Sequence, residues 1–214
     1  MGRAAGVIAK MAYDYRPFPY CRPAGLDQKE RRHKVVIVGA GPIGLAAAIE
    51  LAMYGVASVV LDDNNVVSVG SRAICWSKRS LEILDRLGVG AACIAKGVTW
   101  KVGRTFHGDT EIYNFDLLPE AGHKMPAFVN LQQYYVEEYL VRRALEFPGL
   151  IELRWKNKVI GLDLHTDGVI VEIETPDGAY TIETEWLLAC DGANSDIRSL
   201  MKLHFDGEMF EEKF

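Results

Sequence analysis

The sequence predicts an α/β fold in which a parallel sheet and its helices carry an inserted antiparallel meander. Three observations support this fold class. Residues 35–61 contain a β-branched run, a glycine turn, an apolar helical run and a second β-branched run, and such a strand–helix–strand unit joins parallel strands. Further along the chain, Asp167-Gly168 and Asp177-Gly178 separate runs in which apolar and polar residues alternate. Asp-Gly pairs between alternating runs indicate hairpins, so these runs are expected to form the meander.

The composition is that of a folded, weakly acidic protein. The 214 residues include 24 Lys and Arg against 29 Asp and Glu, which gives a formal charge of −5, and 49% are hydrophobic. This hydrophobic content excludes a disordered tail, and the weak field makes nucleic acid an unexpected partner in spite of the basic residues 31–34. The apolar stretch 35–61 contains glycines, Pro42 and Glu50, so we expect strands and a helix there rather than a membrane segment.

The four cysteines are far apart and lack the spacing of metal ligands. This usage predicts a reduced, cytoplasmic protein without a metal site. The composition is also compatible with a homo-oligomer.

The expected elements follow from the periodicity of apolar residues. Residues 1–33 mix aromatic residues with prolines, which disfavour both helix and central strand, so we expect a lead segment that is extended on the surface. The helix at 78–87 places leucines on one face and stops at Gly88. In chain order, the other expected elements are a strand 35–38, a helix 42–54, a strand 57–61, short strands within 98–118, a helix 133–147, three meander runs 151–164, 169–175 and 180–184, and a strand 186–190.

The first chemical motif is a glycine turn at residues 38–44, Val-Gly-Ala-Gly-Pro-Ile-Gly, between the first strand and the first helix. Glycine at position 39 permits the tight turn, Gly41 lets a diphosphate approach the backbone, and Gly44 permits close packing of helix on strand. The first-turn amides of the helix then direct N–H groups and the positive end of the helix dipole towards the phosphates. The motif therefore predicts a dinucleotide site.

An acidic residue after the second strand supports this prediction. Asp62 directly follows the apolar run 57–61, where a carboxylate is expected to bind ribose hydroxyls. Asp63 is the alternative, but it lies one residue further from the end of the run. Because a GxGxxG turn does not distinguish NAD from FAD, a second motif is needed to choose the cofactor.

That second motif lies at residues 191–198, Asp-Gly-Ala-Asn-Ser-Asp-Ile-Arg, after the apolar strand 186–190, and it matches the pattern DGxxSxxR. Taken with the glycine turn, it makes the chain resemble the FAD-dependent aromatic hydroxylases. These are single-component flavoprotein monooxygenases of the p-hydroxybenzoate, phenol and 3-(3-hydroxyphenyl)propionate hydroxylase kind. The resemblance covers residues 34–200 and implies a Rossmann-like FAD-binding domain.

The resemblance also implies roles for single residues. The glycine turn would hold the FAD diphosphate, and Asp62 stands where the family usually has a Glu on the adenosine ribose. Asp191 and Arg198 would lie near the diphosphate and the transient path of NAD(P)H. Arg72 and Gln133 are similar to the family's arginine after the second strand and its glutamine near the flavin, with a plain loop contact or a surface position as the alternatives. The implied cofactor-binding residues are Gly39, Gly41, Pro42, Ile43, Gly44, Asp62, Arg72, Gln133, Asp191 and Arg198.

The activity implied by the resemblance is NAD(P)H-dependent hydroxylation of a small aromatic, phenolic substrate with O2, for which no catalytic residue is assigned. Residues 34–214 are interpreted as an FAD-binding domain that is incomplete at its C-terminal end, with 98–118 and 203–214 belonging to a substrate-covering sheet. We expect the chain to be the N-terminal portion of a longer enzyme and to be inactive alone. Two other functions stay open: a flavin-dependent reductase or oxidase of the same fold, and a catalytically silent nucleotide-binding module.

Overall fold

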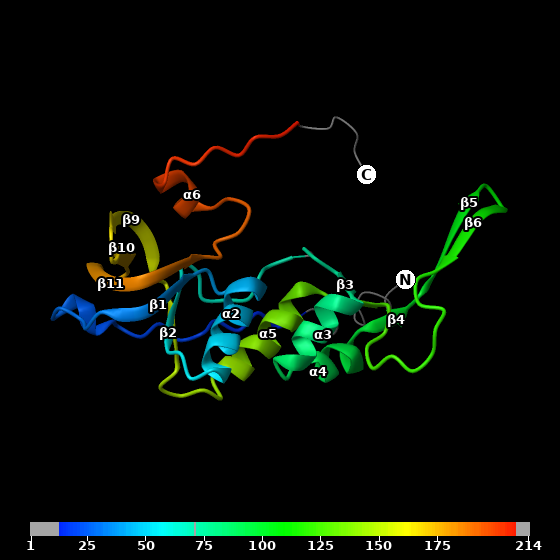
Figure 1. Cartoon of the computed structure of the whole chain (residues 1–214), viewed down its shortest axis with the longest axis horizontal. Helices are drawn as coiled ribbons and strands as arrows, with labels where there is room; N and C mark the ends of the chain where they lie inside the picture. The colour runs from blue at the N-terminus through cyan, green and yellow to red at the C-terminus, as the bar shows by residue number, and fades with distance from the viewer. Residues whose placement is uncertain (1–12, 71, 209–214) are drawn as a thin grey trace, which may run out of the picture.

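A six-stranded sheet forms the centre of the computed structural model, which describes residues 13–70 and 72–208. Its strand order is β8-β2-β1-β11-β10-β9 (Figure 1). The strands β8, β2, β1 and β11 pair in parallel, whereas β11, β10 and β9 pair antiparallel, so the meander continues the parallel sheet. The strand bounds are β1 His33–Val38, β2 Ser58–Asp62, β8 Ile151–Trp155, β9 Lys158–His165, β10 Gly168–Thr175 and β11 Gly178–Ala189.

Both faces of this sheet are covered, and the alternation of side chains in β1 shows how. Val35 and Ile37 point into a core formed with the helices, whereas Val36 and Val38 point into a second core shared with the meander. Because successive side chains of a strand lie on opposite faces, one continuous apolar run can serve two cores. The helices on the first face are α2 Pro42–Met53, α3 Lys78–Arg86, α4 Gly90–Lys96 and α5 Gln133–Ala144, and α6 Asp196–Leu200 lies on the second.

Two smaller sheets extend from the helical side. The first consists of β3 Cys75–Ser77, β7 Phe128–Asn130 and β4 Val98–Trp100, and the second is the hairpin β5 Val102–His107 with β6 Thr110–Asp116. Figure 1 shows this hairpin projecting away from the rest of the domain. The short strands expected within 98–118 are therefore present, and their membership of a substrate-covering sheet stays a prediction. Residues 203–208 form no strand in this chain and 209–214 lie outside the described residues, so the assignment of 203–214 to a substrate-covering sheet also stays a prediction.

Two expected strand boundaries are wrong. The run 151–164 is interrupted at Lys156, whose φ of 59° lies in the left-handed region, and the chain changes from a parallel edge strand, β8, to an antiparallel one, β9. Conversely, 180–184 and 186–190 form the single strand β11, which pairs with both β10 and β1. Both strand boundaries depend on which neighbouring strands form hydrogen bonds with the run. The apolar pattern within one run does not indicate these neighbours.

The lead segment is extended, with one short 3-10 turn at Ala24–Leu26. The Phe18 ring stacks on Trp155 with a centroid separation of 4.5 Å, and the side chain of Glu30 is only 9% exposed beside Arg154. Apart from Pro23, residues 13–32 are exposed or partly exposed, as expected for an extended surface segment, and the contacts of Phe18 and Glu30 anchor that segment to distant strands. Residues 1–12 lie outside the described residues.

Candidate functional site

A cavity of about 420 Å³ lies at the carboxyl ends of the parallel strands. From β1 the chain crosses through α2 to β2 on one side, whereas β11 pairs on the other side of β1. Such a topological switch point is where open α/β sheets bind ligands. The cavity is lined by the glycine turn, by the segments that follow β2 and β11, by the β8–β9 break, and by residues of α5 and the loop before β3.

The three glycines of the turn differ in their surroundings. Gly39 has a φ of +101°, and a side chain there would collide with the carbonyl oxygen of Cys190. A side chain at Gly44 would collide with the carbonyl oxygen of Gly39. Gly41 is different, because a Cβ at this position would have no heavy atom within 4 Å. Two glycines therefore allow the turn to pack, and the third keeps the backbone open towards the cavity.

The N-terminus of α2 faces this cavity. Gly41 is its N-cap residue, Pro42 occupies the first turn, and no side chain of the described residues caps this helix end. The first amides of a helix have no partner within the helix and carry a partial positive charge. This end of α2, bordered by the open backbone at Gly41, can therefore accept an anion.

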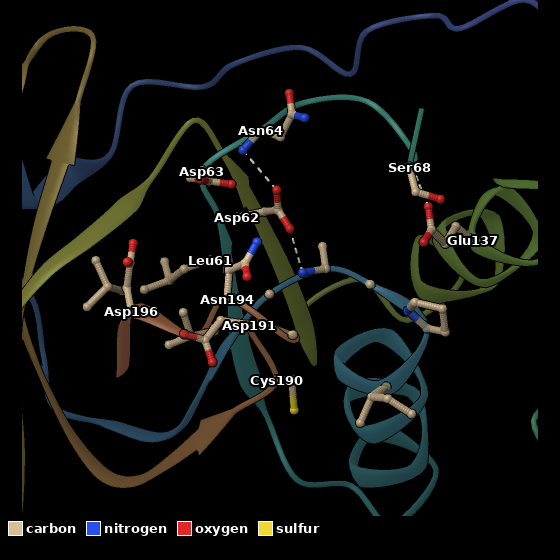
Figure 2. Close-up of a pocket in the computed structure, with 18 of the residues that line it drawn as sticks. Leu61, Asp62, Asp63, Asn64, Ser68, Glu137, Cys190, Asp191, Asn194 and Asp196 are labelled. Carbon is tan, nitrogen blue, oxygen red and sulfur yellow. Dashed lines mark hydrogen bonds between the residues drawn. The ribbon is translucent and has the colours of Figure 1, made fainter. Parts of the chain in front are cut away.

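Asp62, the last residue of β2, ties that strand to the glycine turn. Its carboxylate accepts a hydrogen bond from the Ala40 amide at 2.7 Å and another from the Asn64 amide at 2.8 Å (Figure 2). Burial raises the pKa of this carboxyl above its ordinary value, the two hydrogen bonds oppose the shift, and the charges of Asp63 and Glu137 add to it. A carboxylate has about four acceptor positions, so Asp62 can hold the turn and still accept bonds from ligand hydroxyls.

The polar groups of the second motif, residues 191–198, form hydrogen bonds with one another. The Asp191 carboxylate accepts hydrogen bonds from the Ser195 hydroxyl, at 2.7 and 2.8 Å, and from the Ile197 amide at 3.0 Å. Ser195 in turn caps α6 by accepting a bond from the amide of Arg198. Asp191 nevertheless lines the cavity, and Figure 2 shows it on the other side of the glycine turn from Asp62.

The structure brings eight of the ten predicted residues into the cavity wall and leaves out Gly44 and Arg198. Gly44 is buried in α2 behind the turn. Arg198 is half-buried, donates to the carbonyl oxygen of Ala193 at 3.2 Å and lies over the ring of Phe205. The eight predicted residues that line the cavity are Gly39, Gly41, Pro42, Ile43, Asp62, Arg72, Gln133 and Asp191.

Glu137 is a site residue that the sequence analysis did not select. It is 3% exposed, and its carboxylate accepts hydrogen bonds from the Gln133 amide at 2.7 Å and from the backbone amide of Ser68 at 2.5 Å. The Gln133 side-chain oxygen then accepts a weak bond from the Ala73 amide at 3.3 Å. Glu137 lies four residues after Gln133, so their shared helix face could have indicated it.

Asn157 and Lys158 also line the cavity without having been predicted. They follow the unexpected break between β8 and β9, where the polar triplet 156–158 interrupts an apolar run. That triplet was the signal in the sequence that could have indicated them.

Within the described ranges, no cluster of three or more His, Cys, Asp or Glu side chains could hold a metal ion. All four cysteines are free thiols. No helix among the described residues is long and apolar enough to cross a membrane.

Comparison with known proteins identifies the family. The model of a family described as FAD binding domain matches residues 32–214. The chain belongs to this FAD binding domain family. It is 30% identical over 182 residues to a para-nitrophenol 4-monooxygenase of Pseudomonas sp. (strain WBC-3), covering 84% of this chain and 45% of that enzyme. It is 34% identical to a 12-dehydrotetracycline 5-monooxygenase/anhydrotetracycline 6-monooxygenase of Streptomyces rimosus, covering 83% of this chain and 34% of that enzyme.

A solved structure agrees with the fold. The crystal structure of p-nitrophenol 4-monooxygenase PnpA from Pseudomonas putida DLL-E4 matches with a TM-score of 0.77 and 31% identity, over 84% of this chain and 46% of that one. The chain thus spans less than half the length of these relatives. The Rossmann-like FAD-binding fold expected from the two motifs is confirmed.

The residues of the cavity suit FAD, whose anionic diphosphate lies between a ribose and a ribityl chain that carry hydroxyl groups. The open turn at Gly41 and the uncapped end of α2 offer N–H donors at the centre. Asp62 and Asp191 offer acceptors on either side of that centre. Because carboxylates repel phosphate and accept hydrogen bonds from hydroxyl groups, the backbone donors suit a diphosphate and the carboxylates suit hydroxyl groups.

Proposed function

We propose that this chain holds the adenosine and diphosphate end of FAD in an NAD(P)H-dependent monooxygenase that hydroxylates a phenolic substrate with O2. In this assignment the backbone N–H groups of Gly41 and Ile43 border the diphosphate. Pro42 lies between them, has no N–H group and supplies helical backbone geometry. Asp62 accepts bonds from the adenosine ribose. Asp191 faces the ribityl side through the acceptor capacity left after its contacts with Ser195 and Ile197.

Two residues further from the glycine turn, Gln133 and Arg72, support the cavity wall. Gln133 is held by Glu137 at 2.7 Å and by Ala73, so its amide fixes the loop before β3 against α5. Arg72 lines the cavity from that loop and supplies positive charge. When bound, FAD would accept hydride from NAD(P)H and activate O2 for insertion into an aromatic ring. The residues of this chain bind and position the cofactor.

One of the relatives supports this substrate class. Its name specifies para-nitrophenol, a nitrated phenol. A phenol ring is activated towards electrophilic oxygen by its hydroxyl group, which suits this chemistry. We assign the β5–β6 hairpin and the segment after α6 to the substrate side, because they lie outside the two cores of the sheet.

The observation that carries the proposal is the open backbone at Gly41 in front of the uncapped end of α2. Titration of the chain with FAD, NAD and FMN, followed by flavin fluorescence or calorimetry, tests the cofactor assignment. We expect FAD to bind most tightly, since FMN lacks the adenosine end and NAD, which shares that end, lacks the ribityl chain. Uptake of NAD without FAD would contradict the assignment.

The activity is tested in a longer protein that contains this chain. We expect NADH or NADPH oxidation that is stimulated by phenols, together with a ring product heavier by one oxygen in mass spectrometry. The same assay on the chain alone is expected to give no hydroxylated ring. Substrate reduction or oxidation without oxygen insertion by the longer protein would favour a reductase or oxidase of the same fold.

A further inference from the structure

Residues 13–31 of the lead segment precede the region that the family model matches, which begins at residue 32. We call residues 13–31 the strap. It contacts the segment 63–70, here called the cofactor loop, which follows Asp62 and lines the cavity through Asp63, Asn64, Val66 and Ser68. The strap therefore reaches the FAD site from outside the family's common domain.

The first attachment is at Phe18. Its backbone amide donates to the carbonyl oxygen of Asn65 at 2.6 Å, and the Asn65 side-chain amide donates back to the carbonyl oxygen of Phe18 at 3.0 Å. The Phe18 ring stacks on Trp155, which ends β8 next to Asp62 of β2. The ring thus fixes the point at which the strap pairs with the middle of the cofactor loop (Figure 2, dark blue ribbon above Asn64).

A second attachment lies at the end of the cofactor loop. The Tyr15 hydroxyl accepts a hydrogen bond from the amide of Gly70 at 3.2 Å. Tyr13 packs on Tyr134 of α5 with a centroid separation of 4.3 Å, and its hydroxyl donates to Glu138 of the same helix at 3.0 Å. This part of the strap connects the loop to the helix that carries Gln133.

A third attachment is a buried polar network that begins at Glu30. Its carboxylate binds the Arg154 guanidinium through two bonds of 2.8 and 3.0 Å, and Arg154 also donates to the hydroxyl of Tyr180 at 3.0 Å. The Tyr180 hydroxyl donates to the side-chain oxygen of Asn157 at 2.7 Å, and the backbone amide of Asn157 donates to the carbonyl oxygen of Asp62 at 2.8 Å. An unbroken chain of hydrogen bonds therefore joins the strap to the backbone of the proposed ribose acceptor.

The charge state of this network is stable near neutral pH. Burial alone would raise the pKa of the Glu30 carboxyl, but the hydrogen bonds and charge of Arg154 lower it overall. Burial opposes the charge on Arg154, and its bonds to Glu30 and Glu152 more than compensate, so its pKa is raised. Both groups are therefore ionised, and removal of Glu30 would leave the buried Arg154 with Glu152, whose side chain is 56% exposed, as its acidic partner.

The cofactor loop itself contains neither helix nor strand. A segment of this kind is held by its outside contacts, and those described here come from the strap, from Glu137 and from the β8–β9 break. A loop that is held in the bound conformation before the ligand arrives costs less ordering entropy on binding. Loss of a strap contact should therefore weaken FAD binding without removing any group that touches FAD.

We propose that the strap holds the cofactor loop in its FAD-binding conformation, with Phe18 and Tyr15 as positioning residues for the adenosine end of the cofactor. This inference rests on the proposed FAD site. It assigns a role to a segment that precedes the matched domain.

The test compares two strap variants with a matched control. Phe18→Ala removes the ring that packs on Trp155, and Tyr15→Phe removes only the hydroxyl that accepts from Gly70. Tyr20→Phe is the control, because its hydroxyl bonds Asp177 in the β10–β11 turn, away from the cofactor loop. The measurements are amide hydrogen exchange of residues 63–70 without FAD, thermal unfolding without FAD, and the FAD dissociation constant.

We expect faster exchange in the cofactor loop and weaker FAD binding for both strap variants. The increase in dissociation constant should be roughly two- to tenfold for Tyr15→Phe, as for one hydrogen bond, and roughly tenfold or more for Phe18→Ala. Tyr20→Phe should match the unmodified chain in both measurements. A Tyr15→Phe variant with unchanged thermal unfolding but faster loop exchange would distinguish positioning from general destabilisation.

Two results would overturn the inference. One is unchanged exchange of residues 63–70 in both strap variants. The other is faster exchange with unchanged FAD affinity, because the loop conformation would then not matter to the cofactor. Failure of the unmodified chain to take up FAD would instead contradict the proposed function, and loop exchange without FAD would still decide whether the strap holds the loop.

Discussion

Two glycine turns follow neighbouring strands of the same sheet, yet they use their polar groups in opposite ways. The turn after β1 leaves the backbone open at Gly41 and the end of α2 without a side-chain cap. The turn after β11 satisfies its own groups, because Asp191 binds Ser195 and Ile197 and Ser195 caps α6. The two turns are joined by a bond from the Cys190 amide to the carbonyl oxygen of Val38.

This difference suggests a division of roles, in which the first turn can bind a ligand and the second can fix the conformation of the chain around the cavity. An open helix end needs an external acceptor, and a ligand can supply it. A capped helix end needs no external acceptor, so the capped turn contributes by holding the chain in position. We infer that the first turn contributes most of the affinity for the diphosphate, whereas the second supports the wall opposite it.

The largest effect is expected from Gly41→Val in the first turn. The Cβ of the new side chain meets no heavy atom within 4 Å, so the fold should tolerate the substitution, but the side chain would occupy the space that the diphosphate needs. FAD affinity should fall roughly a hundredfold or more, with thermal unfolding of the FAD-free chain unchanged. Gly207→Val, also in open space, serves as the control. Equal FAD affinity for Gly41→Val and the unmodified chain would show that this turn is not at the diphosphate.

The next effect is expected from Asp62→Ala. This change removes the proposed acceptor of the ribose hydroxyls and the bond that holds the Ala40 amide. Hydrogen bonds to a charged group contribute about 1.5–3 kcal/mol, so FAD affinity should fall roughly ten- to hundredfold, less than for Gly41→Val. Calorimetric titration gives the ranking. Asp63→Ala, at the neighbouring exposed carboxylate, should have a smaller effect, and the reverse order would transfer the ribose role to Asp63.

Gly44→Ala is expected to reduce stability rather than affinity. Its methyl group would collide with the carbonyl oxygen of Gly39, so the turn must shift or the helix must move. Overpacking of this kind costs about 1–3 kcal/mol. Urea unfolding of the FAD-free chain measures the loss, with Gly41→Ala as the matched control. Equal stability of these two alanine variants would contradict the distinction between packing and open glycines.

A smaller loss of stability is expected from Asp191→Ala in the second turn. The variant loses the acceptor for Ser195 and Ile197, and helix-capping contacts of this kind contribute about 0.5–2 kcal/mol. Asn194→Ala changes an exposed neighbour that lines the same cavity and should be close to neutral. Urea unfolding without FAD separates the two. A stability of Asp191→Ala equal to that of Asn194→Ala would refute the capping role.

The smallest effect concerns Cys190, which lies between the two turns and lines the cavity. Burial, with a further contribution from the charge of Asp191, raises the pKa of its thiol. Since the thiolate is the reactive form, alkylation near pH 8 should be several-fold slower at Cys190 than at the exposed Cys21. FAD should slow it further. Peptide mass spectrometry with and without FAD measures both rates, and protection of Cys21 alone would contradict this placement.

The local parts of the fold were predictable because neighbouring residues determine them. The alternation in β1, the helix after the glycine turn and the Asp-Gly hairpins each depend on a short stretch of chain. The positive φ of Gly39 and the close packing at Gly44 match the roles that their spacing implied, whereas the approach of a diphosphate to the open backbone at Gly41 stays a prediction. The break at Lys156 and the continuity of β11 were not predictable in this way, because each depends on which strand lies alongside.

The sequence by itself determined the fold class, the FAD-binding family and eight residues of the cavity wall, since two motifs with defined spacing, and the family resemblance that they establish, carry that information. Only the tertiary structure decided that Arg198 lies away from the cavity, that buried Glu137 holds Gln133, and that Glu30 reaches Asp62 through Arg154, Tyr180 and Asn157. The physical reason is distance along the chain. A hydrogen bond between residues 30 and 154 depends on packing of the whole domain, and neither residue has a local pattern that identifies its partner.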